Sequence, residues 1–264
     1  MSLHVIDGHA AFYRCYYSSL KTESGAAPAP DHALTAFTAW LKDYADKYQP
    51  THLVVALDVS RETFRHEIFP GYKANRKPVP PELSSQLAQF PAYLDQLGVA
   101  HLGAQGFEAD DIIGTLCKMI ASDTYQVFIA SNDKDFCQLV NSRVSIINAK
   151  NETIGTDEVR AKFGVLPEQV IEVLALMGDA ADGIPGVANI GEKTAIALIQ
   201  GWLNLESLYE RLHEVESGIK SGARIAGLLR VGKEEAFLSR TLATINCDVP
   251  LDVNLADFEW RAQP

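Results

Sequence analysis

Acidic side chains recur along this chain at spacings that suit cation binding. Nine of them lie in well-separated segments, mostly at the end of an apolar run or the start of a predicted helix: Asp7, Asp58, Glu108, Asp110, Asp111, Asp133, Asp135, Asp179 and Asp182. Carboxylate oxygens without a His or Cys cluster suit Mg²⁺ or Mn²⁺ rather than zinc. Two such ions about 4 Å apart can activate a water and stabilise the leaving oxygen of a phosphodiester. The acids therefore predict metal-dependent phosphodiester hydrolysis without a protein nucleophile.

Ordinary structural roles compete with this interpretation. A single Asp after a strand is more often a turn or helix-capping residue. The segment GFEADDIIGTL (106–116) opens a helix, and the helix dipole alone favours one or two acids in its first turn. Glu108 and Asp111, however, share a face and repel each other unless a cation lies between them. Recurrence in several segments favours the metal site.

Three apolar runs end in one of these acids: HVID at Asp7, LVVALD at Asp58 and QVFIASND at Asp133. Together with a fourth run at 144–148, and with helix-compatible stretches between them, they predict an α/β protein with a mostly parallel sheet covered on both faces. Ligands bind at the carboxyl ends of the strands in such sheets, so the three aspartates should meet there. Helical patterns are expected at about 82–97 and from 157 onward, and a Pro-rich loop at 23–31.

The composition describes a globular chain. Of 264 residues, 47% are hydrophobic, and no apolar run approaches the roughly 20 residues that a bilayer requires. The start, MSLHVIDGH, resembles neither a signal peptide nor a transit peptide, which predicts a cytoplasmic protein with no membrane partner. The cysteines at 15, 117, 137 and 247 are too far apart for paired zinc knuckles and are expected in the core.

The net charge of −11 argues at first sight against a nucleic-acid partner. Two bound divalent cations would add four positive charges and leave −7, and a basic face can still exist elsewhere. One basic segment, GYKANRK, sets Lys73, Arg76 and Lys77 beside Tyr72, a combination that suits a phosphate and a stacked base. Local sequence alone is more typical of a solvated basic turn.

Five segments, taken together, resemble the motif series of the bacterial 5′ nucleases, the family of the 5′ nuclease domain of DNA polymerase I and of the flap endonucleases. They are DGH (7–9), FRHEIFPGYKANR (64–76), GFEADD (106–111), NDKDFCQL (132–139) and MGDAADGIPGVANIGEKTA (177–195). Order, spacing and wording match from residue 3 to about 253. Because no polymerase sequence follows, we expect a stand-alone nuclease or an isolated nuclease domain.

The resemblance implies a PIN-like nuclease core at 1–156 and 241–264, with a helical arch at about 62–95, and a helix-hairpin-helix DNA-binding region at 157–240, all in one compact unit. It also implies two metal sites. The first gathers Asp7, Asp58, Glu108, Asp110 and Asp111; the second gathers Asp133, Asp135 and Asp182, supported by Asp179.

The resemblance assigns the basic groups as well. Lys73 and Arg76 would contact the scissile phosphate as catalytic groups, and Tyr72 would stack on a terminal base. Lys77, Arg14 and Arg65 are further candidates for DNA contact, although Arg14 and Arg65 also suit salt bridges at the edge of the core. In the turn GVANIGEKTA, the family holds the downstream duplex, often with a K⁺ ion, which points to Gly186, Gly191, Lys193 and Thr194.

Three positions depart from the family pattern. Asn189 replaces a usual Gly, but Asn tolerates a positive φ, so the turn should survive while the K⁺ site becomes less certain. Gly183 replaces a usual Asn, so we expect a missing hydrogen bond and a looser loop. The segment PDH at 30–32 replaces small or hydroxylated residues near the substrate.

The resemblance therefore implies a monomeric, nucleoid-associated 5′-3′ exonuclease and flap endonuclease that acts on DNA with a 5′ flap or a 5′ single-stranded end and uses Mg²⁺ or Mn²⁺. It would leave a 5′ phosphate and a 3′ hydroxyl. Two alternatives stay open. A PIN-type ribonuclease would share the acidic cluster but lack the GVANIGEKTA hairpin and the GYKANR segment. A non-catalytic DNA-junction-binding protein should have lost acids, and none is missing.

Overall fold

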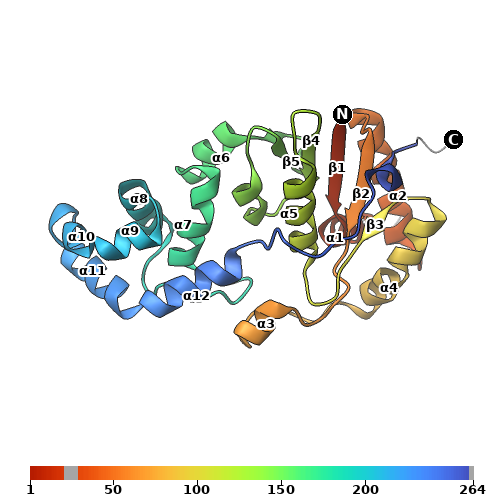
Figure 1. The fold of residues 1–264 in the computed structure, drawn as a ribbon. Helices are drawn as coiled ribbons and strands as arrows, with labels where there is room; N and C mark the ends of the chain where they lie inside the picture. Colours follow the sequence, from red (N-terminus) through yellow and green to blue (C-terminus); the bar gives the residue numbers. More distant parts are fainter. Residues whose placement is uncertain (21–28, 262–264) are drawn as a thin grey trace.

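The centre of the molecule is one sheet (Figure 1). In this computed structural model, which describes residues 1–20 and 29–261, the sheet has six strands in the order β3-β2-β1-β4-β5-β6. The parallel strands are β1 (Ser2–Asp7), β2 (His52–Ala56), β3 (His101–Leu102), β4 (Gln126–Ala130) and β5 (Val144–Ile147). The short strand β6 (Thr153–Ile154) pairs antiparallel with β5. The predicted mostly parallel sheet is confirmed. The strands β3 and β6 were not predicted, because two residues are too few to show a strand pattern in the sequence.

Helices cover both faces of the sheet. One face carries α1 (Gly8–Ser19), α2 (His32–Tyr48) and α4 (Pro81–Gln96); the other carries α5 (Ala109–Ile120), with α6 (Thr156–Phe163) beside it. Alternate residues of β2 show why the strands read as continuous apolar runs: Leu53 and Val55 join the cluster of α1, α2 and α4, whereas Val54 and Ala56 join the cluster of α5.

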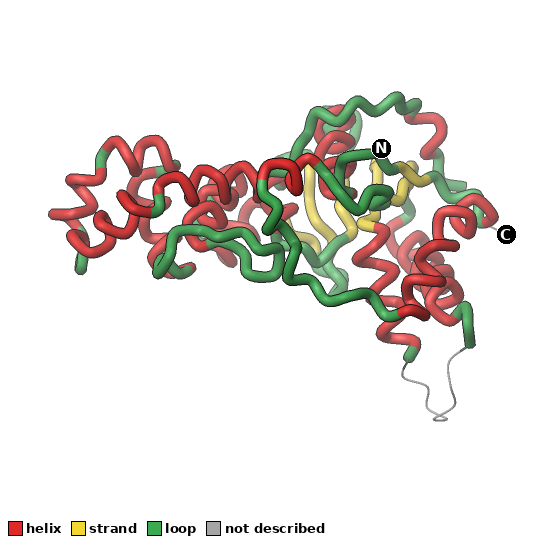
Figure 2. Tube along the Cα trace, turned by 90° about the horizontal axis from the view of Figure 1, so that it is seen from below, coloured by secondary structure: helices red, strands yellow, loops and turns green. Residues whose placement is uncertain are grey.

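The helices from α7 onward form a helical arm that extends sideways from the sheet (Figures 1 and 2). The arm consists of α7 (Val170–Met177), α8 (Glu192–Trp202), α9 (Leu205–Glu210), α10 (Leu212–Gly218), α11 (Gly222–Val231) and α12 (Lys233–Ala243). The buried cluster on the α5 face continues into the arm, where it includes Leu198 and Leu229. Short 3-10 turns complete the chain: η1 (Asp135–Leu139), η2 (Pro167–Gln169) and η3 (Leu255–Phe258). The division into a core and a 157–240 region stays a prediction.

The segment predicted as an arch, 62–95, has two parts. α3 (Phe64–Ile68) and the turn after it lie beyond the carboxyl ends of the strands, next to α12 (Figure 1). α4 instead packs on the sheet layer, where Leu83, Phe90 and Leu94 are fully buried against α1 and α2. Any arch is therefore limited to the residues before α4.

Two other expectations can be compared with the structure. Cys15, Cys117 and Cys137 are buried and unpaired, as predicted, and Cys247 is half-buried. Most of the predicted loop at 23–31 lies outside the described residues. Among the helices of the described chain, none combines the length and the apolarity needed to cross a membrane.

Candidate metal and nucleic-acid site

Three aspartates lie together at the carboxyl edge of the sheet. Asp7 ends β1 and caps α1, accepting a hydrogen bond from the Ala10 amide at 3.1 Å. Asp58 follows β2 and accepts from the Ala109 amide at the start of α5, at 2.8 Å. Asp133 follows β4 and accepts from the Asp135 amide at 2.9 Å. Parallel topology gathers these residues because all three strands end at the same edge.

These carboxylates repel one another when they are ionised. Burial, together with the nearby charges of Asp58 and Asp133, raises the pKa of Asp7 to about 6, although the hydrogen bonds that Asp7 accepts act in the opposite direction. Burial, together with the charges of Asp7 and Asp133, raises the pKa of Asp110 well above its ordinary value. Burial and the charge of Asp133 raise the pKa of Asp135 to about 7. A cation at this edge would relieve the repulsion.

The residues present fit divalent ions. Among the described residues, no three acidic, His or Cys side chains form a ready-made ligand set for one ion. Yet, within residues 1–20 and 29–261, Oδ1 of Asp135 is buried without a hydrogen-bond partner, and no Lys or Arg forms an ion pair with the crowded acids Asp7, Asp58, Asp110, Asp133 and Asp135. Hard oxygens held close together and not bound to a cationic side chain are the donor set that Mg²⁺ or Mn²⁺ prefers.

The other four predicted ligands pair with basic side chains. Glu108 accepts from Lys73 at 2.7 Å. Asp182 pairs with Arg76 at 2.5 Å. Asp179 pairs with Lys134 at 2.6 Å; desolvation raises the pKa of Asp179, but this contact and the hydrogen bonds from the Ala181 and Asp182 amides together outweigh it and lower the pKa. The fourth, Asp111, pairs with Arg65.

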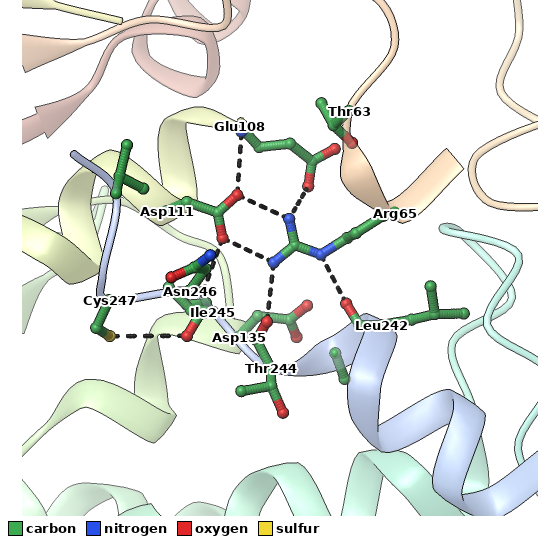
Figure 3. A network of polar contacts seen from close by, with 12 residues as sticks. Thr63, Arg65, Glu108, Asp111, Asp135, Leu242, Thr244, Ile245, Asn246 and Cys247 are labelled. Carbon is green, nitrogen blue, oxygen red and sulfur yellow. Dashed lines mark hydrogen bonds and ion pairs between the residues drawn. The ribbon is translucent and has the colours of Figure 1, made fainter. Parts of the chain in front are cut away.

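Asp111 and Arg65 form a buried ion pair (Figure 3). Asp111 has no exposed surface, and its two oxygens accept from Arg65 Nη1 and Nη2 at 2.8 Å each, from the Asn246 amide at 2.8 Å and from the Glu108 amide at 3.1 Å. Arg65 is 2% exposed. The structure therefore places these residues in a structural contact, rather than in a metal shell and on DNA as predicted. A salt bridge at the edge of the core is the alternative that the sequence offers for Arg65.

Tyr72 is also buried, contrary to the predicted stacking role. Its side chain is 4% exposed, and its hydroxyl donates to Glu108 Oε2 at 2.9 Å. Burial and the charge of Glu108 raise the pKa of the phenol, so it remains a hydrogen-bond donor. The ring is not available to a base because protein atoms cover it. Lys77, in contrast, is exposed.

The turn that carries the basic residues packs on the loop at 179–183. The Lys73 amide donates to the Asp182 carbonyl at 2.8 Å, and Asn75 donates to the Ala180 carbonyl. Gly183 has a φ of 69°, and a Cβ there would lie 2.6 Å from the carbonyl oxygen of Gly71. The departure at 183 therefore permits a close contact between two loops, whereas the sequence predicts a looser loop.

The predicted hairpin lies between α7 and α8. Asn189 has a φ of 63°, so the turn survives the replacement of Gly, as predicted. Gly191 caps α8, and Gly191 and Lys193 are exposed while Thr194 is half-buried. Gly186 differs from its prediction: it is buried, and its amide donates to Ser239 Oγ at 2.8 Å. That amide is not available to a phosphate.

Arg14 lies in α1 and packs against Trp40 of α2. Its guanidinium carbon is 4.7 Å from the centre of the Trp40 ring, and its buried Nη2 has no hydrogen-bond partner among the residues that the structure describes. It lines a cavity of about 230 Å³ together with Lys47 and Asn148. Its contact with DNA stays a prediction.

Sequence reasoning missed two residues at the site. Ser131 donates to Asp7 Oδ2 at 2.8 Å and accepts from the Asp133 amide at 3.1 Å, so it links the ends of β1 and β4. The Asp58 amide donates to His9 Nδ1 at 3.2 Å. Ser131 lies two residues before Asp133, and His9 is the last residue of the motif DGH, to which no role was assigned.

Comparison with known proteins identifies the family. Residues 2–164 match the family of the 5′-3′ exonuclease N-terminal resolvase-like domain, and residues 165–264 match that of the 5′-3′ exonuclease C-terminal SAM fold. The chain is 36% identical over 257 residues to the 5′-3′ exonuclease of Buchnera aphidicola, covering 96% of this chain and 90% of that protein.

Longer and more distant relatives agree. DNA polymerase I of Bacillus subtilis is 35% identical over 98% of this chain, which spans 29% of that relative's length. The fold is similar to that of the bacteriophage T5 flap endonuclease, solved in a complex with DNA and metal ions, with a TM-score of 0.75, 23% identity, and coverage of 94% of this chain and 89% of that one. By both matched domains and by its full-length relative, the chain belongs to the 5′-3′ exonuclease family.

Proposed function

We propose that the chain is a structure-specific 5′ nuclease that hydrolyses DNA phosphodiesters with two divalent metal ions. The observation that carries the proposal is the crowding of Asp7, Asp110 and Asp135 at one sheet edge, where each pKa stays raised although Lys73 and Lys134 offset part of the shifts of Asp110 and Asp135. Natural selection of such a costly arrangement makes sense where an external cation completes it.

The acids divide between ions by their position. Asp7, Asp58, Glu108 and Asp110 would hold the first ion; Asp133, Asp135 and Asp182, with Asp179 behind, would hold the second. When bound, the ions activate a water and stabilise the leaving oxygen, leaving a 5′ phosphate and a 3′ hydroxyl. Mg²⁺ is the expected ion and Mn²⁺ its substitute.

The basic turn would hold the scissile phosphate. In the free protein Lys73 and Arg76 neutralise Glu108 and Asp182. Cations at those acids would release both side chains toward an incoming phosphate, where Lys77 already lies exposed. Lys73 is only partly exposed, pairs with Glu108 and interacts with the charge of Asp110, so its own charge is well placed to stabilise charge that develops on the phosphate.

The hairpin would hold duplex DNA by its backbone. The start of α8, where Gly191 and Lys193 are exposed, and the side chains of Lys193 and Thr194 suit a phosphate, and a K⁺ ion at the turn would add charge. Substrate with a 5′ flap or 5′ single-stranded end would reach the sheet edge from the arm. A monomer acting in the cytoplasm at the nucleoid completes the proposal, with 1–156 and 241–264 as the core and 157–240 as the gripping region.

One assay tests the function. Labelled DNA with a 5′ flap should be cut in Mg²⁺ and bound without cutting in EDTA, with nicked, single-stranded and RNA substrates run in parallel. Cutting of RNA alone would favour a PIN-type ribonuclease. Binding without cutting in Mg²⁺ and in Mn²⁺ would leave a non-catalytic junction-binding protein.

A further inference from the structure

Arg65 uses every hydrogen-bond donor that its side chain has. Nε donates to the Leu242 carbonyl at 2.9 Å, Nη1 to Asp111 at 2.8 Å and Glu108 at 3.2 Å, and Nη2 to Asp111 at 2.8 Å and the Thr244 carbonyl at 2.9 Å. A guanidinium has five N–H groups, and all five are occupied. With 2% of its surface exposed, Arg65 has no donor left for a phosphate.

The acceptors of Arg65 belong to two parts of the molecule that are distant in sequence. Glu108 and Asp111 lie at the start of α5, where the predicted metal site begins. Leu242 lies in the last turn of α12 and Thr244 just beyond it, at the base of the helical arm. A positive charge at a helix C-terminus also interacts favourably with the carbonyl groups of the last turn. One buried side chain thus joins the arm to the acidic edge (Figure 3).

In the arm, further contacts hold the part of α12 that Arg65 binds. Ser239 of α12 is fully buried and accepts from the Gly186 amide in the loop after α7. Arg240 pairs with Glu172 of α7 at 3.2 Å. If the C-terminal end of α12 were displaced, α7 and the loop that carries Asp179 and Asp182 would therefore move with it.

The join is specific on the side of the acids. Asp111 accepts hydrogen bonds from both Nη1 and Nη2 of the guanidinium and neutralises its charge. Glu108 accepts a single, longer hydrogen bond through Oε2. Glu108 Oε1 stays directed to Lys73. Arg65 can therefore orient Glu108 without consuming the oxygen that faces the basic turn.

We propose that Arg65 is a positioning residue that sets the distance and orientation between Glu108 and the helical arm, so that DNA held by the arm arrives in register with the metal site. The inference rests on the proposed nuclease function. It makes the effect of Arg65 on cleavage and metal affinity indirect, through Glu108, and it assigns Arg65 no contact with DNA.

The test uses Arg65→Lys and Arg65→Ala beside the wild-type protein. Lysine keeps the charge but cannot reach both Asp111 oxygens and both carbonyls. We expect both variants to lose about 10- to 100-fold in kcat and in Mn²⁺ affinity, as losses of groups that orient metal ligands usually do. The salt dependence of DNA binding in EDTA should not change. Lys193→Ala serves as the control that lowers this slope, by about 0.9 if one phosphate contact is lost.

Two results would overturn the proposal. A lower salt slope for Arg65→Ala would make Arg65 a DNA contact. A lower Tm, with kcat per folded molecule and Mn²⁺ affinity unchanged, would make it a purely structural residue. If Arg65→Ala does not fold, Arg65→Lys carries the comparison. If the wild-type protein cuts nothing, the nuclease proposal fails, while the Mn²⁺ titration still reports whether Arg65 orients Glu108.

Discussion

The hydroxyl of Tyr72 donates to Oε2 of Glu108 over 2.9 Å, and both side chains are more than nine-tenths buried. Glu108 thus receives three donors from one short segment of chain, because Arg65 and Lys73 flank Tyr72 in the same motif. A motif that looks like a DNA-binding stretch in the sequence is, in the free protein, a set of contacts that hold one carboxylate.

Tyr72→Phe tests that contact. Removing the hydroxyl leaves the ring in place but lets Glu108 turn, so we expect cleavage to fall about 10-fold with DNA affinity unchanged. Steady-state kinetics and filter binding in EDTA measure the two effects, and Tyr17→Phe, at an exposed ring, is the control. Unaltered cleavage would mean that the hydroxyl does not orient Glu108.

Lys73→Ala should slow cleavage much more than it weakens binding. Loss of one group that stabilises the charge of the transition state commonly costs about 100-fold in kcat, whereas the grip on duplex DNA resides in the hairpin. Single-turnover rates and dissociation constants separate the two. Lys77→Ala removes an exposed charge four residues away and should act mainly on binding. Equal losses of rate and affinity for Lys73→Ala would reduce Lys73 to a docking residue.

Asp110→Asn and Asp111→Asn form an adjacent pair with opposite expected effects on stability. Asp110 is crowded by Asp7 and Asp133, so its neutral replacement should raise the Tm in EDTA while abolishing cleavage. Asp111→Asn leaves the buried charge of Arg65 without its carboxylate and should lower the free energy of unfolding by about 3 kcal/mol or more. Urea unfolding in EDTA measures both. Similar stability changes in the two variants would contradict the assignment of separate roles.

The acidic edge predicts an unusual pH dependence. Asp7 and Asp135 have folded-state pKa values of about 6 and 7, above the ordinary 3.8. Between about pH 4 and pH 7 the folded protein binds more protons than the unfolded chain, so their contribution to the free energy of unfolding falls as the pH rises.

Mg²⁺ should reverse this trend, because it replaces the protons. At pH 8 we expect a saturating concentration of Mg²⁺ to raise the Tm by on the order of 5 °C, and by less at pH 5. Thermal melts across pH with Mg²⁺ and with EDTA check this, and Asp135→Asn should flatten the EDTA profile. An equal gain from Mg²⁺ at both pH values would argue against metal binding by these groups.

Gly183→Ala should loosen the contact between the basic turn and the 179–183 loop. The new Cβ would lie 2.6 Å from the Gly71 carbonyl oxygen, and the φ of 69° adds a cost of about 1–2 kcal/mol. Trypsin should then cut faster near Lys73 and Arg76. Gly201→Ala is the matched control: nothing lies within 4 Å of a Cβ there, and Ala in α8 should stabilise the protein by about 0.5–1 kcal/mol. Equal unfolding curves for the two variants would disprove the close contact.

Local patterns were enough to predict much of this protein. Apolar runs ending in Asp7, Asp58 and Asp133 predicted three strands of the parallel sheet, because side-chain periodicity and strand length are properties of neighbouring residues. The positive φ of Asn189 followed from the tolerance of its own side chain. The acidic composition of the site followed in the same way from residue types alone.

Tertiary structure alone decided which of the charged groups form ion pairs within the protein and which do not. Arg65 meets Asp111 across 46 residues and Leu242 across 177; Gly186 meets Ser239 across 53. Such contacts depend on how helices pack, and no spacing in the chain encodes them. They separate Asp110, which is crowded by other acids and has no ion pair in the described part of the chain, from its neighbour Asp111, which is buried in an ion pair, although the sequence presents the two as equals.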